Sequence, residues 1–263
     1  MMMTDQCIVL RLAGPLQSWG VASQFNERRT APAPTKSGVL GLLAAALGRR
    51  RRDPIEDLVK LQMGVRSDQP GSLLRDYHTV SDHPGTPLLS ANLDARGHQK
   101  RTSPKKFTQP THRFYLEDAV FVAVLQGEEG FMTDLAHALR HPVFPLALGR
   151  RSCVPVQPLL LPGDAGDLWS GAVTSVLSRV PWQASAHARD RINTVQVRLA
   201  ASWDDIDGED LLSDVPTSFD PKRRGMRTRK VHSGWIDIPT GHDLDPKAES
   251  AHASHDPFEL LGW

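Results

Sequence analysis

FYLEDAVFVAVLQG, at residues 114–127, is the most strongly strand-forming segment of the chain, and the assignments around it build on it. Valine, phenylalanine and tyrosine favour extended backbone, and a run this apolar is typical of a strand buried in a sheet. The stretch that follows, GFMTDLAHALRHP, has the apolar spacing of an amphipathic helix, with Thr133 or Asp134 near its start and Pro142 ending it. A strand followed directly by a helix indicates a mixed architecture of strands and helices.

The segments on either side extend this unit. QCIVLRLAG (6–14) predicts a buried strand, KSGVLGLLAAALG (36–48) a helix packed against a sheet, and SLLRDYHTV (72–80) a second strand. DPIEDLVKLQ predicts a further short helix with Asp53 as its N-cap, and GRRSCVPVQPLLL (149–161) is a loop entering a last strand. The resulting order is βαββαβ, which predicts an α+β, ferredoxin-like domain over residues 1–162.

The rest of the chain departs from this pattern. Residues 81–112 are polar and rich in Pro, Gly, Lys and Arg, which predicts an inserted arm or hairpin between the two middle strands. Residues 163–239 form a small β-rich region, with strands expected at 192–202 and 229–239. The stretch from 240 to 263 is polar with scattered His and Asp, and we expect most of it to be a flexible tail.

Composition indicates a protein of the reducing cytoplasm. The 263 residues include no apolar run of membrane-spanning length, and the start MMMTDQCIVLRLAG lacks the basic region of a signal peptide. Cys7 and Cys153 make no disulfide framework. The predicted fold makes their strands neighbours, so the two residues are expected close together, as free buried thiols.

The net charge is only +1, but the basic residues are segregated. They cluster at 49–52, 100–106, 150–151 and 222–230, whereas acidic residues cluster at 204–210. A segregated basic face binds phosphates even on a nearly neutral chain. The four-arginine run at 49–52 is interpreted as solvated surface, because arginine at a helix C-terminus also favours the helix dipole.

The start of the predicted helix at 36–48 resembles a phosphate cradle. It lacks the glycines of a nucleotide P-loop, and the prolines in RTAPAP remove the backbone N–H donors that such a loop needs. ATP is therefore not the expected ligand. A helix N-terminus carrying Lys36 and Ser37 still attracts phosphate, and the alternative is that Thr35 or Ser37 simply caps the helix.

Four quoted pieces occur together in one order: LRLAGPLQSWG, PTKSGVLGLLAAALG, LLRDYHTV and LGRRSC. In this combination the chain closely resembles the CasD family, the fifth family of CRISPR-associated proteins (RAMP superfamily), in its type I-E form. The resemblance covers residues 8–158, more than half of the chain, and VPTSFDPKRRG is similar in character. The long Pro/Lys-rich arm and the His/Asp tail depart from the family pattern.

The resemblance implies a non-catalytic, RNA-binding subunit of Cascade, the RNA-guided ribonucleoprotein complex of antiviral defence. Such proteins bind the 5′ handle of the CRISPR RNA and cap one end of the backbone filament. Their fold is an RRM-like ferredoxin domain with a β-hairpin thumb and a C-terminal β region. The expected partners are the CRISPR RNA, the backbone subunit and the large subunit, with target DNA reached indirectly and no membrane. No cofactor and no metal are expected.

The resemblance also suggests which residues hold the RNA. Lys36 and Ser37 would face its backbone, Arg150 and Arg151 would meet phosphates or splayed bases, and Lys105, Lys106 and Arg113 would hold a kinked backbone at the thumb. Gln17 offers a base-edge hydrogen bond and Trp19 a stacking face, although Trp19 is equally expected in the core. Strand geometry puts Arg75 and Tyr77 on one face and Asp76 and His78 on the other. The candidate RNA-binding residues are Gln17, Trp19, Lys36, Ser37, Arg75, Tyr77, Lys105, Lys106, Arg113, Arg150 and Arg151.

Three alternatives remain open. Type I-C relatives cleave CRISPR repeat RNA without a metal, which would need a base, an acid and a cation. Those roles would fall to His78 or His112, Tyr77, and Lys105 or Lys106. A metal site at His252, His255 and Asp256 lacks compact spacing. A stand-alone RNA-recognition module lacks the aromatic signature expected of it.

Overall fold

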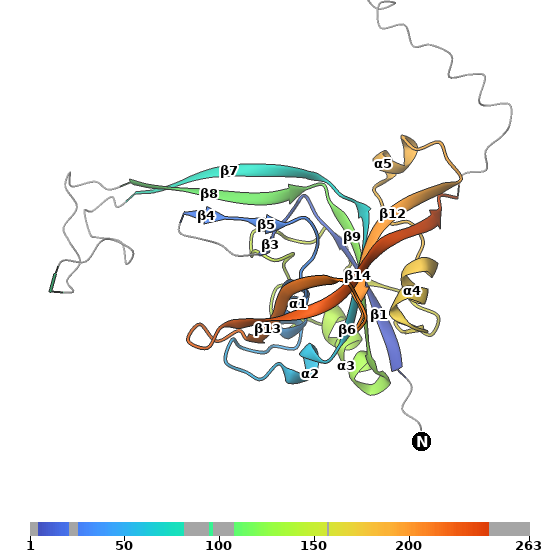
Figure 1. The fold of residues 1–263 in the computed structure, drawn as a ribbon, viewed down its shortest axis with the longest axis horizontal. Helices are drawn as coiled ribbons and strands as arrows, with labels where there is room; N and C mark the ends of the chain where they lie inside the picture. Colours follow the sequence, from blue (N-terminus) through green and yellow to red (C-terminus); the bar gives the residue numbers. More distant parts are fainter. Residues whose placement is uncertain (1–4, 21–25, 82–94, 97–107, 157, 242–263) are drawn as a thin grey trace, which may run out of the picture.

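The computed structural model describes residues 5–20, 26–81, 95–96, 108–156 and 158–241. Strands dominate and helices are few, which confirms the predicted mixed class (Figure 1). The helices are α1 (Lys36–Ala46), α2 (Glu56–Val59), α3 (Glu129–Arg140), α4 (Val173–Arg179) and α5 (Ala186–Asp190). None of these described helices combines the length and the hydropathy needed to cross a membrane.

An eight-stranded sheet takes strands from both ends of the chain. Its order is β10-β1-β9-β6-β12-β14-β13, β11 also pairs with β1, and neighbouring strands are antiparallel. Its strands are β1 (Asp5–Ala13), β6 (Gln62–Gln69), β9 (Val120–Glu128), β10 (Leu160–Leu161), β11 (Trp169–Ser170), β12 (Gln196–Asp204), β13 (Asp210–Ser218) and β14 (Gly225–Pro239). The predicted C-terminal β-rich region therefore continues the sheet that the N-terminal strands begin.

Both faces of the middle of this sheet are buried. Side chains along a strand alternate between the faces. On β1, Ile8 and Leu10 belong to the core cluster shared with α1 and α3, whereas Cys7 and Val9 belong to the cluster shared with α4. This two-sided burial explains why β1 and β9 are continuous apolar runs instead of alternating ones.

A second, four-stranded sheet forms a long arm that projects from the body (Figure 1). β7 (Ser72–Ser81) and β8 (Thr108–Glu117) pair along their length, and β2 (Leu16–Gln17) and β4 (Glu27–Arg28) lie along the other edge of β8. β3 (Trp19–Gly20) and β5 (Thr30–Ala31) form a separate short ladder. Most of the predicted arm, at 82–94 and 97–107, and the tail at 242–263 lie outside the described residues.

The stretch 114–127 is two strands, so the prediction of a single strand was incorrect. β8 ends at Glu117 and β9 begins at Val120. Between them Asp118 has a φ of 53°, a left-handed conformation that aspartate tolerates better than most residues. The chain turns there from the arm into the body.

The second strand of the large sheet was also assigned to the wrong residues. Residues 72–80 belong to β7 of the arm, and β6 fills that position in the large sheet. Sequence reasoning missed β6 because its buried residues include charged ones: Arg66 is 0% exposed and Asp68 is 3% exposed. They form an ion pair at 2.7 Å between Nε and Oδ1, which makes their burial tolerable.

The helix ends follow the sequence signals unevenly. Thr35 caps α1, because its Oγ1 accepts a hydrogen bond from the Gly38 N–H at 3.3 Å, and Gly48 follows the helix with a φ of 75°. Asp53 does not cap α2, which begins after Ile55 without a side-chain cap. α3 begins at Glu129, one turn before Thr133.

Both cysteines are buried free thiols, as predicted. They are not packed together, because Cys7 lies in the cluster beneath α4 and Cys153 lies in the cluster on the opposite face of the sheet. The Cys7 Sγ–H donates to the Gly171 carbonyl at 3.3 Å. Burial, helped by the charge of Asp5, raises the pKa of Cys7 to about 12, and burial also raises the pKa of Cys153.

Candidate nucleic-acid interface

The loop between Leu148 and Cys153 is a tight turn. The Leu148 N–H donates to the Cys153 carbonyl at 2.7 Å, and the Cys153 N–H donates to the Arg150 carbonyl at 2.9 Å. Gly149 has a φ of 89°, and a Cβ there would lie 1.8 Å from the Ser18 carbonyl oxygen. Only glycine allows the loop to approach the backbone of residue 18 so closely.

Arg150 fastens this loop to the arm. One Nη donates to the Phe114 carbonyl at 3.2 Å and the other to the Arg28 carbonyl at 2.5 Å. The guanidinium also lies 4.8 Å from the centre of the Tyr115 ring, within the range of a cation–π contact. Arg150 thus has a structural role, and Arg151, next to it, is exposed. The loop presents one free-standing guanidinium to solvent.

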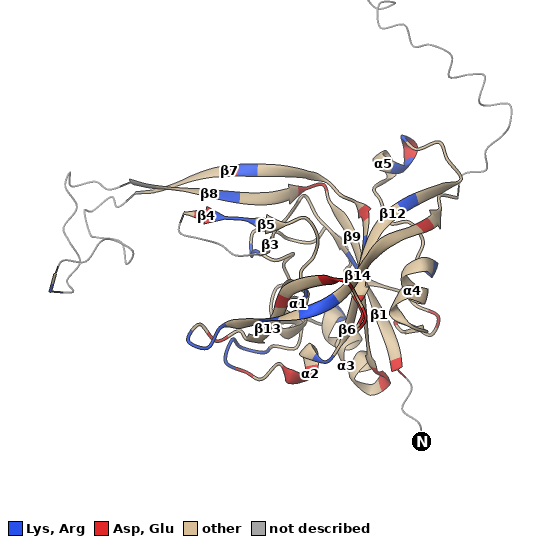
Figure 2. Cartoon of the chain, in the orientation of Figure 1, with Lys and Arg blue, Asp and Glu red and all other residues tan. Residues whose placement is uncertain are grey.

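The arm presents a second set of predicted residues. Arg75 and Tyr77 are both exposed, Tyr77 by 62%, and they share a face of the hairpin, since they pair across the ladder with Phe114 and His112. The Tyr77 and His112 rings lie 5.4 Å apart between centroids. Figure 2 shows basic segments on both β7 and β8. An exposed aromatic ring beside a cation is the combination that single-stranded nucleic acid favours.

The other face of the hairpin carries different chemistry. His78 Nδ1 and Asp76 Oδ2 lie 3.1 Å apart, as expected for residues two apart on one strand. Arg113 pairs in register with Asp76 on β7 and with Arg28 on β4, and it is half-buried. The strand geometry predicted from the sequence is confirmed: Arg75 and Tyr77 are separated from Asp76 and His78.

Gln17 and Trp19 are core residues, each 0% exposed. The Gln17 amide donates to the Leu12 carbonyl at 2.9 Å and to the Ala119 carbonyl at 2.7 Å. Its oxygen accepts the Trp19 indole N–H at 3.1 Å. In this conformation neither residue can present a base-edge hydrogen bond or a stacking face to RNA.

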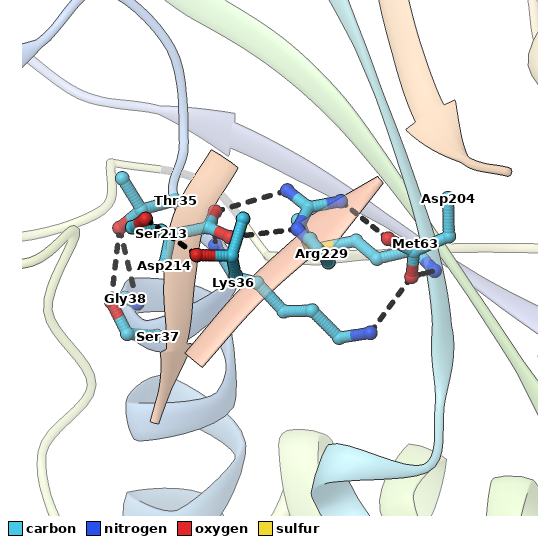
Figure 3. Close-up of polar contacts among 10 residues, drawn as sticks. Thr35, Lys36, Ser37, Gly38, Met63, Asp204, Ser213, Asp214 and Arg229 are labelled. Atoms are coloured by element: carbon cyan, nitrogen blue, oxygen red, sulfur yellow. Dashed lines mark hydrogen bonds and ion pairs between the residues drawn. The ribbon is translucent and has the colours of Figure 1, made fainter. Parts of the chain in front are cut away.

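The predicted phosphate cradle at the start of α1 already holds an anion, the carboxylate of Asp214. The Lys36 backbone N–H donates to Asp214 Oδ2 at 2.7 Å, and the Lys36 ammonium pairs with Asp204 Oδ2 at 2.7 Å (Figure 3). Lys36 is 5% exposed, and Ser37 lies beside it with its Oγ 3.4 Å from that of Thr35. The geometry therefore does not support the predicted contact of Lys36 with RNA phosphates.

Arg229 completes this buried network. It bonds Asp214 at 2.7 and 3.0 Å and Asp204 at 2.5 Å, and the Met63 N–H donates to Asp204 at 2.9 Å. Burial acts to lower the pKa of Arg229, but the bonds and charges of the two carboxylates outweigh it and leave the pKa raised. The network joins α1, β6, β12, β13 and β14. Sequence reasoning missed it because its partners are distant in sequence.

Two remaining predictions fall outside the described residues: Lys105 and Lys106, and the histidines and aspartate of the tail. Within the described ranges, no group of three or more His, Cys, Asp or Glu residues is arranged to hold a metal ion. The surface assembled from described residues therefore consists of the arm face and the loop at Arg151.

Comparison with known proteins identifies the class. A profile of the family described as CRISPR-associated protein (Cas_Cas5) matches residues 7–232. The chain therefore belongs to this family.

Within the family, the chain is 37% identical over 168 residues to the CRISPR system Cascade subunit CasD of Escherichia coli (strain K12), covering 59% of this chain and 69% of that relative. A chain of a solved CRISPR RNA-guided surveillance complex matches with a TM-score of 0.70 and 34% identity, over 89% of this chain and 91% of that chain. A crystal structure described as that of a Cas protein matches with a TM-score of 0.63 and 34% identity, over 89% and 97% of the two chains.

Proposed function

We propose that this protein is a non-catalytic subunit of a Cascade-type CRISPR complex, in which it binds the 5′ handle of the CRISPR RNA and caps one end of the backbone filament. Its family and its likeness to a chain of an RNA-guided surveillance complex support a role in such an assembly. The backbone subunit and the large subunit are its proposed protein partners. Reading of the target sequence is left to base pairing with the guide.

The strand order supports a ferredoxin-like, RRM-like RNA-binding unit within the large sheet. β10, β1, β9 and β6 lie side by side and antiparallel, and α1 and α3 join them in the order βαββαβ. In this proposal the β7–β8 hairpin, inserted between β6 and β9, is the thumb that folds over the guide.

The observation that carries the proposal is the coupling of the arginine loop to the arm. Arg150 bonds the carbonyl of Phe114, and Phe114 is the cross-strand partner of Arg75. The exposed Arg151 is thereby fixed relative to the exposed Arg75 and Tyr77. Two cations and an aromatic ring held on one rigid frame suit a short, kinked single strand of RNA.

The test uses the full chain and a fluorescent RNA with the 5′-handle sequence, with binding followed by anisotropy over a series of KCl concentrations. Arg75→Ala/Arg151→Ala is expected to weaken binding and to lower the salt slope by about 1.4, because each lost phosphate contact on a single strand contributes about 0.7. The matched control is Arg189→Ala/Arg198→Ala, which removes the same charge from exposed sites elsewhere. Equal binding by both variants would overturn the proposal.

A metal-independent endoribonuclease is the second candidate, and one observation favours it. Tyr77 and His112 are in ring contact, and the buried Nδ1 of His112 has no hydrogen-bond partner among the described residues. Incubation of the full chain with CRISPR repeat RNA in EDTA distinguishes the two functions. Intact RNA is expected. Cleavage at a defined position that His112→Ala abolishes would replace the scaffold role with RNA processing.

A further inference from the structure

Two exposed basic runs lie outside the arm and its loop. Residues 50–52, all arginine, follow α1, and residues 222–224, Lys-Arg-Arg, form the turn of the β13–β14 hairpin. All of these side chains are exposed, and none has a hydrogen bond or ion pair to another described residue. These two runs are called the second basic patch below.

The fold holds both runs at one end of the molecule. β13 lies against α1 and α2, and residues 50–52 belong to the loop that joins those two helices. Phe219, just before the hairpin turn, packs against the main core cluster and lies close to Gly41 in α1. Figure 2 shows basic segments on the hairpin and on the neighbouring loop.

The neighbouring cations show that the charges of the patch are not needed for folding. Arg49 bonds Asp57 and, at 2.9 Å, the Pro54 carbonyl, so it holds the loop in shape. Arg229 holds the hairpin through Asp204 and Asp214. The fold thus uses Arg49 and Arg229 as internal ties and leaves the residues of the patch directed at solvent. Unpaired like charges held together repel one another, which favours a polyanionic partner.

We propose that the second basic patch binds the phosphate backbone of duplex DNA without reading its sequence. Proteins that hold single strands place aromatic rings among their basic residues, and neither run contains one. Protein–protein interfaces are depleted of Lys and centre on apolar side chains, which the runs also lack. Evenly spaced phosphates on a duplex are the partner that arginine and lysine alone suffice to hold.

This inference does not depend on handle binding, because it uses different residues from the arm and its loop. In an assembly that searches duplex DNA, such a patch would raise the local concentration of DNA at this subunit and speed encounter. The contact would be direct, in addition to any contact through base pairing with a guide.

The experiment measures binding of the full chain to a fluorescent duplex DNA of arbitrary sequence, by anisotropy at several KCl concentrations. The test variant is Arg51→Ala/Arg223→Ala/Arg224→Ala, and the matched control Arg189→Ala/Arg191→Ala/Arg198→Ala removes the same charge from exposed residues elsewhere. The test variant is expected to bind roughly tenfold or more weakly, with a salt slope lower by about 3, since each lost contact to B-DNA contributes about 0.9. The control is expected to bind as the unmodified chain does.

Three outcomes would overturn the proposal. One is duplex binding by the test variant with unchanged affinity and slope. Another is an equal loss in the control variant, which would reflect net charge alone. A third is normal duplex binding combined with failure of the test variant to co-purify with other Cascade subunits, which would make the patch a protein interface. Because handle RNA is measured separately, failure of this inference leaves the proposed function standing, and the reverse also holds.

Discussion

At the scale of single residues, Gly149 shows how one position controls a whole loop. A methyl group there would meet both a left-handed backbone, at a φ of 89°, and the Ser18 carbonyl oxygen at 1.8 Å. Gly149→Ala is therefore expected to cost roughly 3 kcal/mol of folding free energy, more than backbone strain alone. Urea unfolding followed by circular dichroism measures this cost.

Gly166 provides the matched control for that prediction. Its φ is 68°, but nothing lies within 4 Å of the position of a Cβ. Gly166→Ala should cost only the strain of the left-handed backbone, roughly 1–2 kcal/mol. If the two variants were equally stable, close approach to Ser18 would not be the reason for glycine at 149.

Lys36 and Arg229 rank differently in the buried network. Lys36→Ala leaves Asp204 bonded to Arg229, whereas Arg229→Ala removes both side-chain bonds of Asp214 and one of Asp204. Removing one partner of a buried pair costs roughly 3–5 kcal/mol, and we expect Lys36→Ala near the lower end and Arg229→Ala near the upper. Thermal unfolding checks the order. Handle-RNA binding by folded Lys36→Ala should be unchanged, and a selective loss would show that Lys36 contacts RNA after all.

The two thiols should be inert in the folded protein. Because only thiolates react readily, iodoacetamide at pH 8 is expected to label neither Cys7 nor Cys153 until guanidinium unfolds the chain. The pKa of Cys7 rises on folding from 9.0 to about 12, so between these values the unfolded state loses a proton that the folded state keeps. Stability from this group is thus present below pH 9 and is lost as the pH rises towards 12. Mass spectrometry of native and unfolded samples measures labelling, and rapid native labelling of Cys7 would contradict its burial.

At the scale of elements, the two faces of the β7–β8 hairpin make a sharp comparison. Tyr77→Ala is expected to weaken handle-RNA binding by roughly 1–3 kcal/mol, the value of one base stacked on an aromatic ring. Thr79→Ala is the control on the same face, since Thr79 is exposed and lies farther along the strand. His78→Ala, on the opposite face, should bind normally. A larger loss in His78→Ala than in Tyr77→Ala would mean that RNA contacts the other face.

The sequence predicted elements well where one physical pattern dominated. Residues 6–14 and 36–48 were recognised because β1 and α1 are buried on nearly all sides, and their boundaries agree with the prediction within a few residues. β6 was missed because Arg66 and Asp68 interrupt its apolar pattern while remaining buried as a pair. β13 was missed because it begins inside an acidic run. Partners that make such charges tolerable come from distant parts of the chain and leave no local signal.

The candidate site divides in the same way. Strand periodicity correctly placed Arg75 and Tyr77 together, because it is a local rule. The cradle at Lys36 was misjudged because a helix N-terminus indicates only that an anion is favoured there. That the anion is the carboxylate of Asp214, far along the chain, is a tertiary fact. Gln17 likewise looked like a ligand contact until its buried bonds to Leu12 and Ala119 were visible.

At the scale of the whole molecule, the question is whether residues 1–162 form a unit that can fold alone. β12 pairs directly with β6, through Ala201–Arg66, Ser202–Val65 and Trp203–Gly64. α4 covers one face of β1 and β9. Both elements come from beyond residue 162. A chain ending there would expose an open sheet edge and an apolar face together, which is a recipe for aggregation.

Electrostatics leads to the same expectation. Arg66 donates to the Val180 carbonyl at 2.8 Å and to the Pro181 carbonyl at 3.1 Å, and Lys36 depends on Asp204. Truncation after residue 162 would leave Lys36 as a buried, unpaired cation and Arg66 short of acceptors, each costing several kcal/mol by the rule for broken buried pairs. That loss is comparable with the roughly 5–15 kcal/mol stability of a whole domain.

We therefore expect residues 1–162 to give no cooperative thermal transition and to aggregate on expression, while the full chain unfolds in a single transition. Calorimetry checks the second point, because a two-state unit has equal calorimetric and van't Hoff enthalpies. A chain ending at residue 241 keeps every described contact and serves as the control. Two separate transitions in the full chain, or a stable fragment 1–162, would mean that the shared sheet is two domains placed edge to edge. A single transition would mean that the RNA-facing arm and the second basic patch are held on one cooperative frame, so that a destabilising change in either half weakens both surfaces.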